Sequence, residues 1–393
     1  MLGRPRSPPS SARTANVSVF LVVVWLLLPM SEPRGRLWNS VDRSLKAVRE
    51  LATQGYTIVT VCDRQTALDH ASQVWDDLEA LGTGICRDDE DTCNNERWPQ
   101  TTHGLLQNQS AGLWHGVCGA RLATEPAFTR LFGGKRAIFS FDAAAVIRPT
   151  SQERTFKREK KNQISKGEKV LLASWCHTDQ AKAKQQCMEH IQGAFALTDL
   201  GPAEQRTQLV IPPEGTTIQD FRDAFIAAHP AKKVSKGFDP EREEWVKHDD
   251  DERQWLIEHG RVITPTLEAG QMLLWDSGVP HASIPGPLLQ HTFLRNFRMS
   301  VFVSALPLEL IDADDLAVRR EMLEEADTSG HRVTAPGKRK GKYRKCKFAK
   351  TGRTYGKSLP TYKNTRVVTG FKSAIAKGED SVAAKMARIC GGY

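Results

Sequence analysis

The chain has 393 residues, of which 40% are hydrophobic and 26% are charged. This composition fits one large or two modest globular domains, and it excludes a wholly disordered, collagen-like or multi-span membrane protein. The net charge of +9 is unevenly spread, because residues 331–393 carry 17 Lys or Arg against two Asp or Glu. Any electrostatic attraction to nucleic acid is therefore a property of this tail, which we expect to contribute little to the core.

Residues 1–36 lack the pattern of a folded segment. Three arginines precede an apolar run over residues 17–28, which has the order of a signal peptide but is short for a membrane span. Three interpretations remain open: a signal peptide or signal anchor, an uncleaved membrane tether, or an upstream extension with the working start at Met30. The last predicts a cytoplasmic or nuclear protein, and only an anchor would bring the chain to a membrane.

Residues 37–134 are predicted to form a helical buttress. Asn39 can cap a first helix, and Thr66 can open a second one with an apolar stripe. Between them Tyr56–Val61 has the composition of a strand. A further short helix is predicted to begin at Thr124, which precedes a Glu-Pro pair.

Residues 135–310 contain short apolar runs of strand length. These runs cover residues 137–147, 170–176, 193–199, 208–211, 261–264, 271–276 and 297–304. Two helices are predicted between them, over Thr217–His229 and Glu241–His259. Many short strands separated by turn residues favour a sandwich or barrel over a parallel α/β sheet.

A histidine and an aspartate two residues apart follow one of these runs, in Trp175-Cys-His177-Thr-Asp179-Gln. In an extended chain their side chains project on the same side, so they can hold one ion together. A third ligand is expected from His281, which follows an apolar run and a small-residue turn. Two His and one carboxylate on one face leave coordination positions open, as in the facial triad of non-haem Fe(II) oxygenases.

Other candidate ligands are assigned different roles. His190, His248 and His291 are expected on the surface or in the core, and the acidic run 249–252 is expected to be a charged helix face. The eight cysteines include no CxxC pair, which argues against a thiolate zinc site.

Arg298 and Ser300 follow the distal histidine and are predicted to share one face of a strand, while Arg295 belongs to the other face. Together they could hold a carboxylate through a charge-assisted hydrogen bond and a hydroxyl group.

The order H-x-D, distal His, then R-x-S resembles the Fe(II)/2-oxoglutarate oxygenases and, more narrowly, the phytanoyl-CoA dioxygenase family in its divergent large-DNA-virus and protist members. The resemblance covers roughly residues 105–310. Trp175–Gln180 is similar to that family's W-x-H-x-D-Q, and Leu274–Ser277 with His281 is similar to its L-W-x-S-x-x-x-H stretch. The resemblance implies a mainly β fold with flanking helices: a double-stranded β-helix, or cupin-like jelly-roll barrel, with its site in the open mouth.

The resemblance also implies an activity. His177, Asp179 and His281 would bind Fe(II), and 2-oxoglutarate and O₂ would be consumed in hydroxylating a substrate, with release of succinate and CO₂. Four residues would contact 2-oxoglutarate: Arg298, Ser300, Ser283 and Arg148.

The substrate stays open, because Pro213-Glu214 and Gln271 depart from the family pattern beside the substrate mouth. Two other functions are weighed: a non-catalytic jelly-roll module, and a nucleic-acid-binding protein that acts through its basic tail. The predicted division of the chain is a leader or spurious extension, a helical buttress, an oxygenase core, and a helix with the basic tail, over residues 1–36, 37–134, 135–310 and 311–393.

Overall fold

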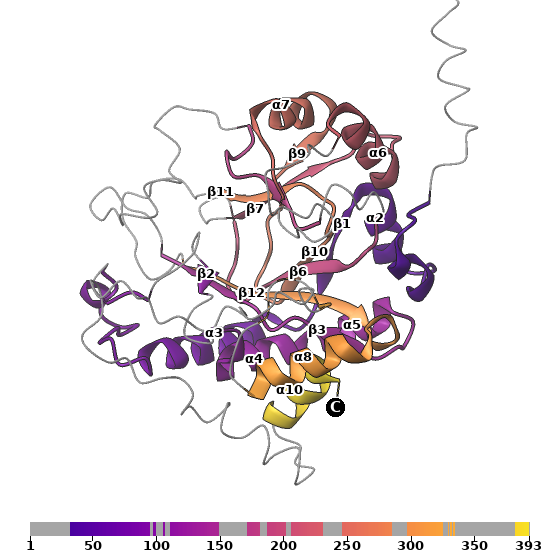
Figure 1. Cartoon of the computed structure of the whole chain (residues 1–393). Helices are drawn as coiled ribbons and strands as arrows, with labels where there is room; N and C mark the ends of the chain where they lie inside the picture. The colour runs from indigo at the N-terminus through magenta and orange to yellow at the C-terminus, as the bar shows by residue number, and fades with distance from the viewer. Residues whose placement is uncertain are drawn as a thin grey trace, which may run out of the picture. The chain divides into compact units, whose positions relative to one another are not determined.

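Two antiparallel sheets face each other in the computed structural model of the chain (Figure 1). The larger sheet has the order β1 (Tyr56–Thr60), β10 (Gln271–Asp276), β6 (Ile191–Ala196), β12 (Arg298–Pro307), β4 (Ala144–Ile147) and β2 (Leu105–Leu106), and β3 (Ala137–Phe139) also pairs with β12. The smaller sheet has the order β8 (Val246–Lys247), β5 (His177–Thr178), β11 (His281–Ile284), β7 (Arg206–Ile211) and β9 (Arg261–Ile263).

The structure describes only part of the chain. The described residues are 32–94, 97–99, 105–106, 111–148, 171–180, 187–201, 206–230, 246–284, 297–324, 329, 331, 333–334 and 382–392. The apolar run 17–28, Met30, Arg295 and His291 lie outside them. Of the helices that are described, none is long and apolar enough to cross a membrane.

The path of the chain between the sheets defines the fold. Strands β4, β5, β6 and β7 alternate between the larger and the smaller sheet, β9 pairs beside β7, and β10, β11 and β12 alternate again. This connectivity is that of a double-stranded β-helix, or jelly roll, and it confirms the predicted fold class.

Helices cover the outer faces of both sheets (Figure 1). Below the larger sheet lie α3 (Arg64–Glu79), α4 (His115–Ala123), α5 (Glu125–Leu131), α8 (Ala313–Glu324) and α10 (Val382–Gly391). Against the smaller sheet lie α6 (Ile218–Ala228) and α7 (Asp250–His259), and α2 (Lys46–Gln54) lies beside β1. Short 3-10 helices cover Arg36–Ser40, Glu90–Thr92, Ala111–Leu113 and Leu308–Leu310.

The two-residue period of β12 separates packing from chemistry. Met299, Val301 and Val303 are buried in the cluster that includes the helices under the larger sheet. The alternate residues Arg298 and Ser300 therefore face the space between the sheets. Strand alternation thus gives β12 one apolar face for the core and one face for the site.

Several predicted boundaries were wrong for local reasons. Asp63, not Thr66, caps α3 and accepts a hydrogen bond from the Thr66 backbone. The predicted helix over 241–259 begins at Asp250, because Asp249 and Glu252 form a capping box there. The acidic run is therefore the start of α7 and not a metal cage, as expected.

Two predicted strands also differ. The run 137–147 is divided into β3 and β4 by an interruption at 140–143. The run 171–176 is not a strand, and the short strand β5 begins only at His177. The N-terminal region is more than a helical buttress, since β1 extends the larger sheet by pairing with β10.

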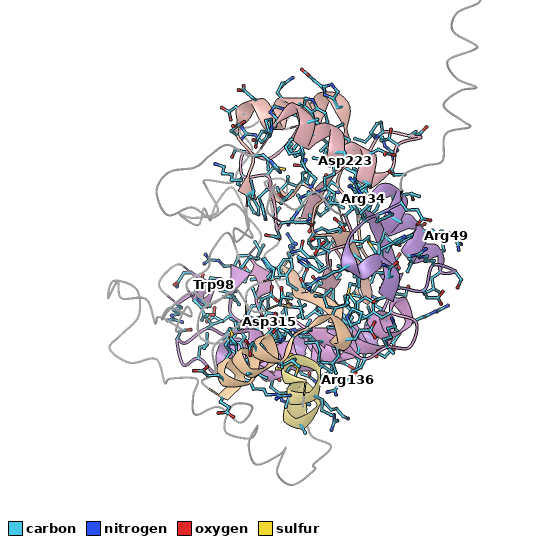
Figure 2. The ribbon with its side chains drawn as sticks, turned by 45° about the vertical axis from the view of Figure 1, so that its right-hand side comes forward. Arg34, Arg49, Trp98, Arg136, Asp223 and Asp315 are labelled. Atoms are coloured by element: carbon cyan, nitrogen blue, oxygen red, sulfur yellow. The ribbon has the colours of Figure 1, made fainter. Side chains whose placement is uncertain are left out.

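The segment before the first 3-10 helix is attached to helix α6, which lies against the smaller sheet. The guanidinium of Arg34 donates to both carboxylate oxygens of Asp223 in α6, at 2.7 and 2.5 Å (Figure 2). Both side chains are partly exposed, so the pair contributes little to the free energy of unfolding.

The C-terminal helix α10 is part of the core, which corrects the expectation that the basic tail contributes little to it. Met386 and Ile389 are fully or almost fully buried, and α10 packs on α8, α4 and β3. Arg136 donates to the carbonyl oxygen of Arg388 at 2.8 Å (Figure 2). The apolar face of α10 is short and follows a long basic stretch. The amino-acid composition of residues 331–393 as a whole therefore does not indicate a buried helix.

Met386→Ala should lower the free energy of unfolding by about 2–5 kcal/mol, because it deletes a buried side chain and leaves a cavity. Urea denaturation measures the change. Arg388→Ala, on the exposed side of the same helix, is the control and should change the value by no more than about 0.5 kcal/mol. Equal stability of wild type and Met386→Ala would contradict the packing of α10.

Candidate metal centre

His177, Asp179 and His281 come together between the sheets, as the sequence predicts. Each is buried, and one ligand atom from each lies within 4.8 Å of the others. His177 is in β5, and His281 lies directly opposite it in β11. Asp179 Oδ1 is 3.8 Å from His177 Nε2, and its Oδ2 is 3.2 Å from His281 Nε2.

Backbone carbonyls select the tautomer of both histidines. His177 Nδ1 lies 3.1 Å from the carbonyl oxygen of Trp175, and His281 Nδ1 lies 2.9 Å from that of Val279. A carbonyl only accepts, so each Nδ1 carries the hydrogen, an assignment made from these contacts. In the neutral ring each Nε2 then holds a lone pair aimed at the Asp179 carboxylate.

Burial keeps these groups in the protonation states that a metal requires. Burial, together with the nearby His281, lowers the pKa of His177 to about 3, so this ring is neutral at pH 7. Burial opposes ionisation of Asp179, but the hydrogen-bonding contact with His281 holds its pKa well below the usual value. Lone pairs of a neutral imidazole and of a carboxylate repel, and a cation between them removes that repulsion.

Neighbouring side chains fix the ligands in place. Gln192 in β6 donates to Asp179 Oδ2 at 2.8 Å. The Trp175 ring stacks on His177 with centroids 5.1 Å apart, and the Trp275 ring lies 5.3 Å from that of His281. Such outer contacts set ligand orientation in metal sites. Sequence reasoning did not single out Gln192, because only the pairing of distant strands brings it to Asp179.

A tight turn aims His281 at the other ligands. Asp276 is fully buried and accepts hydrogen bonds from the backbone of Met188 and, at 2.7 Å, of Gly278. Burial raises its pKa to about 6 despite these bonds. Arg222 donates to the Gly278 carbonyl at 3.0 Å, and a Cβ at Gly278 would lie 2.7 Å from that guanidinium. A larger residue at this position would therefore have to displace the Arg222 guanidinium.

Arg298 forms a second polar centre between the sheets. It is 1% exposed and donates to Ser283 Oγ at 3.0 Å and to Thr207 Oγ1 at 3.2 Å. Within the described residues, its Nε has no hydrogen-bond partner and no carboxylate pairs with it. Burial without such a partner lowers its pKa to about 10, so the group is still a cation at pH 7.

Ser283 and Ser300 lie with Arg298, as predicted, whereas Arg148 does not. Ser283 binds Arg298 directly, and Ser300 is fully buried with an Oγ that has no partner in the described part of the chain. Arg148 instead donates to the Cys93 carbonyl at 3.1 Å and lies over the Trp98 ring, 4.8 Å from its centroid. This places it among the residues of the N-terminal region.

Two other histidines lie in the core. His248 is fully buried and contacts Glu252 at 3.2 Å, and His190 is buried as well. Both are core histidines, in agreement with the sequence.

These residues fit Fe(II) and 2-oxoglutarate. Two neutral imidazoles and one carboxylate are the donor set of a non-haem iron site. A buried guanidinium without a carboxylate and a serine hydroxyl without a partner are what a bound dicarboxylate would satisfy.

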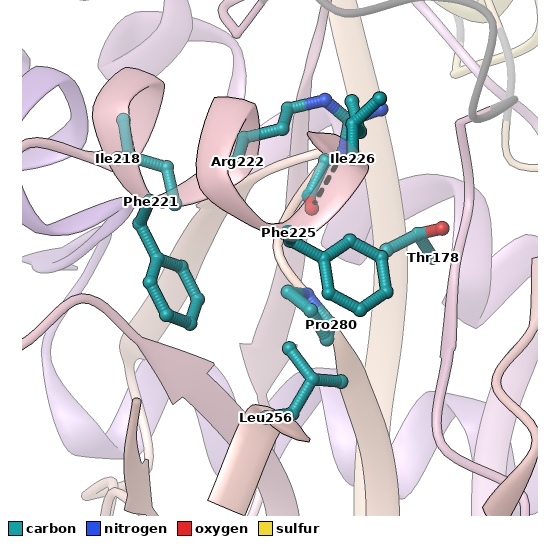
Figure 3. Close-up of a pocket in the computed structure, with 9 residues that line it drawn as sticks. Thr178, Ile218, Phe221, Arg222, Phe225, Ile226, Leu256 and Pro280 are labelled. Carbon is teal, nitrogen blue, oxygen red and sulfur yellow. Dashed lines mark hydrogen bonds between the residues drawn. The ribbon is translucent and has the colours of Figure 1, made fainter. Parts of the chain in front are cut away.

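A small apolar pocket lies behind the ligand strands and not at the metal centre (Figure 3). Phe221 and Phe225 of α6, Leu256 of α7 and Pro280 line it, with Thr178 at one side. Thr178 alternates with His177 and Asp179, so its side chain belongs to the opposite face of the strand. The pocket is therefore part of the packing of α6 and α7 on the smaller sheet.

Comparison with solved structures gives distant similarities. The α-ketoglutarate-dependent carbocyclase SnoK from nogalamycin biosynthesis is 12% identical, with a TM-score of 0.34 over 69% of this chain and 86% of that one. EctD from S. alaskensis, solved with 2-oxoglutarate and 5-hydroxyectoine, is 11% identical, with a TM-score of 0.37 over 71% and 83%. AviO1 from Streptomyces viridochromogenes is 14% identical, with a TM-score of 0.38 over 68% and 96%.

No family model and no curated protein matches the chain. At these levels of similarity, function has to be inferred from the geometry of the site itself.

Each of the substitutions His177→Ala, Asp179→Ala and His281→Ala should weaken Fe(II) binding by more than about 100-fold. Gln192→Ala removes only the hydrogen bond to the Asp179 carboxylate, so it should weaken Fe(II) binding by about 10–100-fold. Anaerobic calorimetry measures affinity and stoichiometry, with one ion per chain expected for the wild type.

His259→Ala removes an exposed histidine and serves as the control with unchanged affinity. Undiminished binding in His281→Ala would show that the third ligand is another residue, and His291 would be tested next.

Proposed function

We propose that the protein is an Fe(II)- and 2-oxoglutarate-dependent dioxygenase that hydroxylates its substrate. The observation that carries this proposal is the buried triad of His177, Asp179 and His281, whose ligand atoms lie close enough together to hold one metal ion. The intact triad and the buried Arg298 also argue against a non-catalytic jelly-roll module, which has no need of either.

The chain supplies the positions of the reactants. The Nε2 atoms of His177 and His281 and the carboxylate of Asp179 would hold Fe(II) and leave coordination positions open. Bound iron supplies the redox chemistry by which 2-oxoglutarate and O₂ give succinate, CO₂ and a hydroxylated product.

Arg298 would bind the distal carboxylate of 2-oxoglutarate. Ser283 and Thr207 hold the guanidinium at two of its nitrogen atoms. Ser300, on the same face of β12, offers a hydroxyl group beside it. The sheets exclude water from this space, which strengthens the ionic contact.

Within this class, the order of motifs favours a phytanoyl-CoA dioxygenase-like enzyme. Gln271 and Pro213-Glu214 depart from that family's pattern, so we extend the proposal to the reaction and not to the phytanoyl-CoA substrate.

Arg298→Ala should raise the apparent KM for 2-oxoglutarate at least tenfold, because a hydrogen bond to a charged group contributes about 1.5–3 kcal/mol. Anaerobically loaded enzyme is exposed to O₂ without added substrate, and the slow release of succinate is measured against 2-oxoglutarate concentration.

Arg295→Ala is the matched control and should change little, because the sequence pattern assigns Arg295 to the opposite face from Arg298. The reverse result would show that Arg295, and not Arg298, binds the co-substrate. Failure of the wild type to release any succinate would contradict the proposed activity itself.

We also propose that the basic segment between two buried parts of the C-terminal region, Val333 and helix α10, binds nucleic acid. Most of the 17 Lys and Arg of the tail lie between Val333 and Val382, with Tyr343, Phe348 and Tyr355 interleaved. Lys and Arg suit phosphates, and the aromatic rings suit stacking on bases. A binding test must leave both buried parts intact, because α10 is buried.

Replacing residues 338–372 by a neutral Gly/Ser linker of equal length should abolish binding of a single-stranded oligonucleotide and leave succinate release unchanged. For the wild type, the logarithm of affinity should fall with the logarithm of salt concentration, with a slope of roughly −0.7 per phosphate contacted for single strands. Fluorescence anisotropy measures both. Equal affinity of the two proteins would contradict a role for the segment.

A further inference from the structure

Gln192 in β6 has one polar atom that the contacts around the metal centre leave without a partner. The side chain is 2% exposed, and its Nε2 donates to Asp179 Oδ2 at 2.8 Å. A carboxylate only accepts, so the amide nitrogen faces Asp179 and Oε1 is the other atom, an assignment made from this contact. Within the described residues, this buried Oε1 has no hydrogen-bond partner. A buried acceptor of this kind requires a donor.

The unpaired oxygen of Gln192 lies beside the metal centre. Amide bond lengths put Oε1 close to Nε2, so it lies within about 5 Å of Asp179 Oδ2. That carboxylate oxygen is itself 3.2 Å from His281 Nε2. A group that donates to Gln192 Oε1 would therefore lie next to the place where the iron is held.

The co-substrate cannot supply this donor. At pH 7, 2-oxoglutarate has two carboxylates and a keto group, and all of these oxygens accept hydrogen bonds. A metal ion has no hydrogen to donate. The donor is therefore expected on the substrate, the third component that has to lie beside the iron.

A second unpaired polar atom belongs to the neighbouring strand. Trp275 in β10 lies directly opposite Gln192, so the two side chains share one face of the larger sheet with Cβ atoms about 5 Å apart. Trp275 is 3% exposed, and its indole Nε1 has no hydrogen-bond partner in the described part of the chain. Its ring lies beside that of His281, with centroids 5.3 Å apart. The two strands thus offer one acceptor and one donor beside two metal ligands.

An adjacent acceptor and donor match an uncharged group that both donates and accepts. An alcohol hydroxyl does both with a single oxygen atom, whereas a carboxylate only accepts and an ammonium group only donates. The next residue on this face of β6 is Ala194, which lies between Leu273 of β10 and Phe302 of β12. The sheet surface beyond the two polar atoms is therefore apolar and suits a carbon skeleton.

We propose that Gln192 and Trp275 bind a hydroxyl group of the substrate. Gln192 Oε1 accepts the hydrogen of this group, and Trp275 Nε1 donates to its oxygen, while the carbon skeleton lies against Ala194 and Phe302. Because Gln192 also holds Asp179, this contact fixes the substrate relative to the iron. The inference rests on the proposed function, because iron and 2-oxoglutarate define where the substrate binds.

The test compares pentan-1-ol with butyl methyl ether, two probes with equal numbers of heavy atoms of which only the alcohol can donate. The full-length protein is loaded with saturating Fe(II) and 2-oxoglutarate without O₂, and each probe is titrated while the visible absorption of the iron complex is recorded. The wild type should bind the alcohol at least about tenfold more tightly, because the ether leaves the buried Gln192 oxygen without a donor. In Gln192→Leu the two probes should bind equally.

Trp275→Phe keeps an aromatic ring beside His281 and removes only the indole donor. Both probes contain an oxygen that accepts, so this variant should bind each of them about fivefold or more weakly and retain the preference for the alcohol. Gln254→Leu removes an exposed glutamine on α7 and should leave both affinities unchanged. In every variant, the absorption before addition of a probe shows that the iron site is loaded.

Equal affinities in the wild type would show that the substrate does not serve Gln192 Oε1, and would overturn the inference. Binding of neither probe, or a preference that persists in Gln192→Leu, would overturn it as well. Unchanged affinities in Trp275→Phe would contradict the donor role of Trp275. Each of these results leaves the proposed function intact, whereas a wild type without absorption from an iron–2-oxoglutarate complex would contradict the proposed function itself.

Discussion

The structure depends on one electrostatic constraint: two imidazoles and a carboxylate point their ligand atoms at one another in a buried space. The carbonyls of Trp175 and Val279 leave each ring nitrogen nearest to Asp179 as a lone pair. A cation held between these groups would satisfy their acceptor atoms. The pairing of β5 with β11, the turn that ends at His281 and the hydrogen bond from Gln192 all serve to hold this arrangement.

The two-residue period of the strands separates this chemistry from the core. Along β12 one face is apolar and packs on helices, while the other carries Arg298, Ser300 and Phe302 toward the interior. Strand β12 can therefore line the proposed 2-oxoglutarate position with Arg298 and Ser300. The helices outside pack on the outer faces of the two sheets and bury the apolar side of their strands.

Local patterns made much of the site predictable. The residues His177 and Asp179 are two apart, and Arg298 and Ser300 are two apart, so an extended backbone suffices to put each pair on one side. Most strands and helices were found, with errors at their ends. Beginning β5 at 170 was wrong, because Leu172, Ala173 and Cys176 are buried without joining a sheet. The tail was misjudged because its charge concealed the few apolar residues of α10.

The sequence by itself determined which side chains can serve as metal ligands, because ligand types and their spacing in a strand are local properties. Only the tertiary structure decided which distant groups join them. Gln192 and Asp276 reach the site through strand pairing and a buried turn. None of these contacts has a local signature, because each depends on the free energy gained when residues far apart in the chain are buried together.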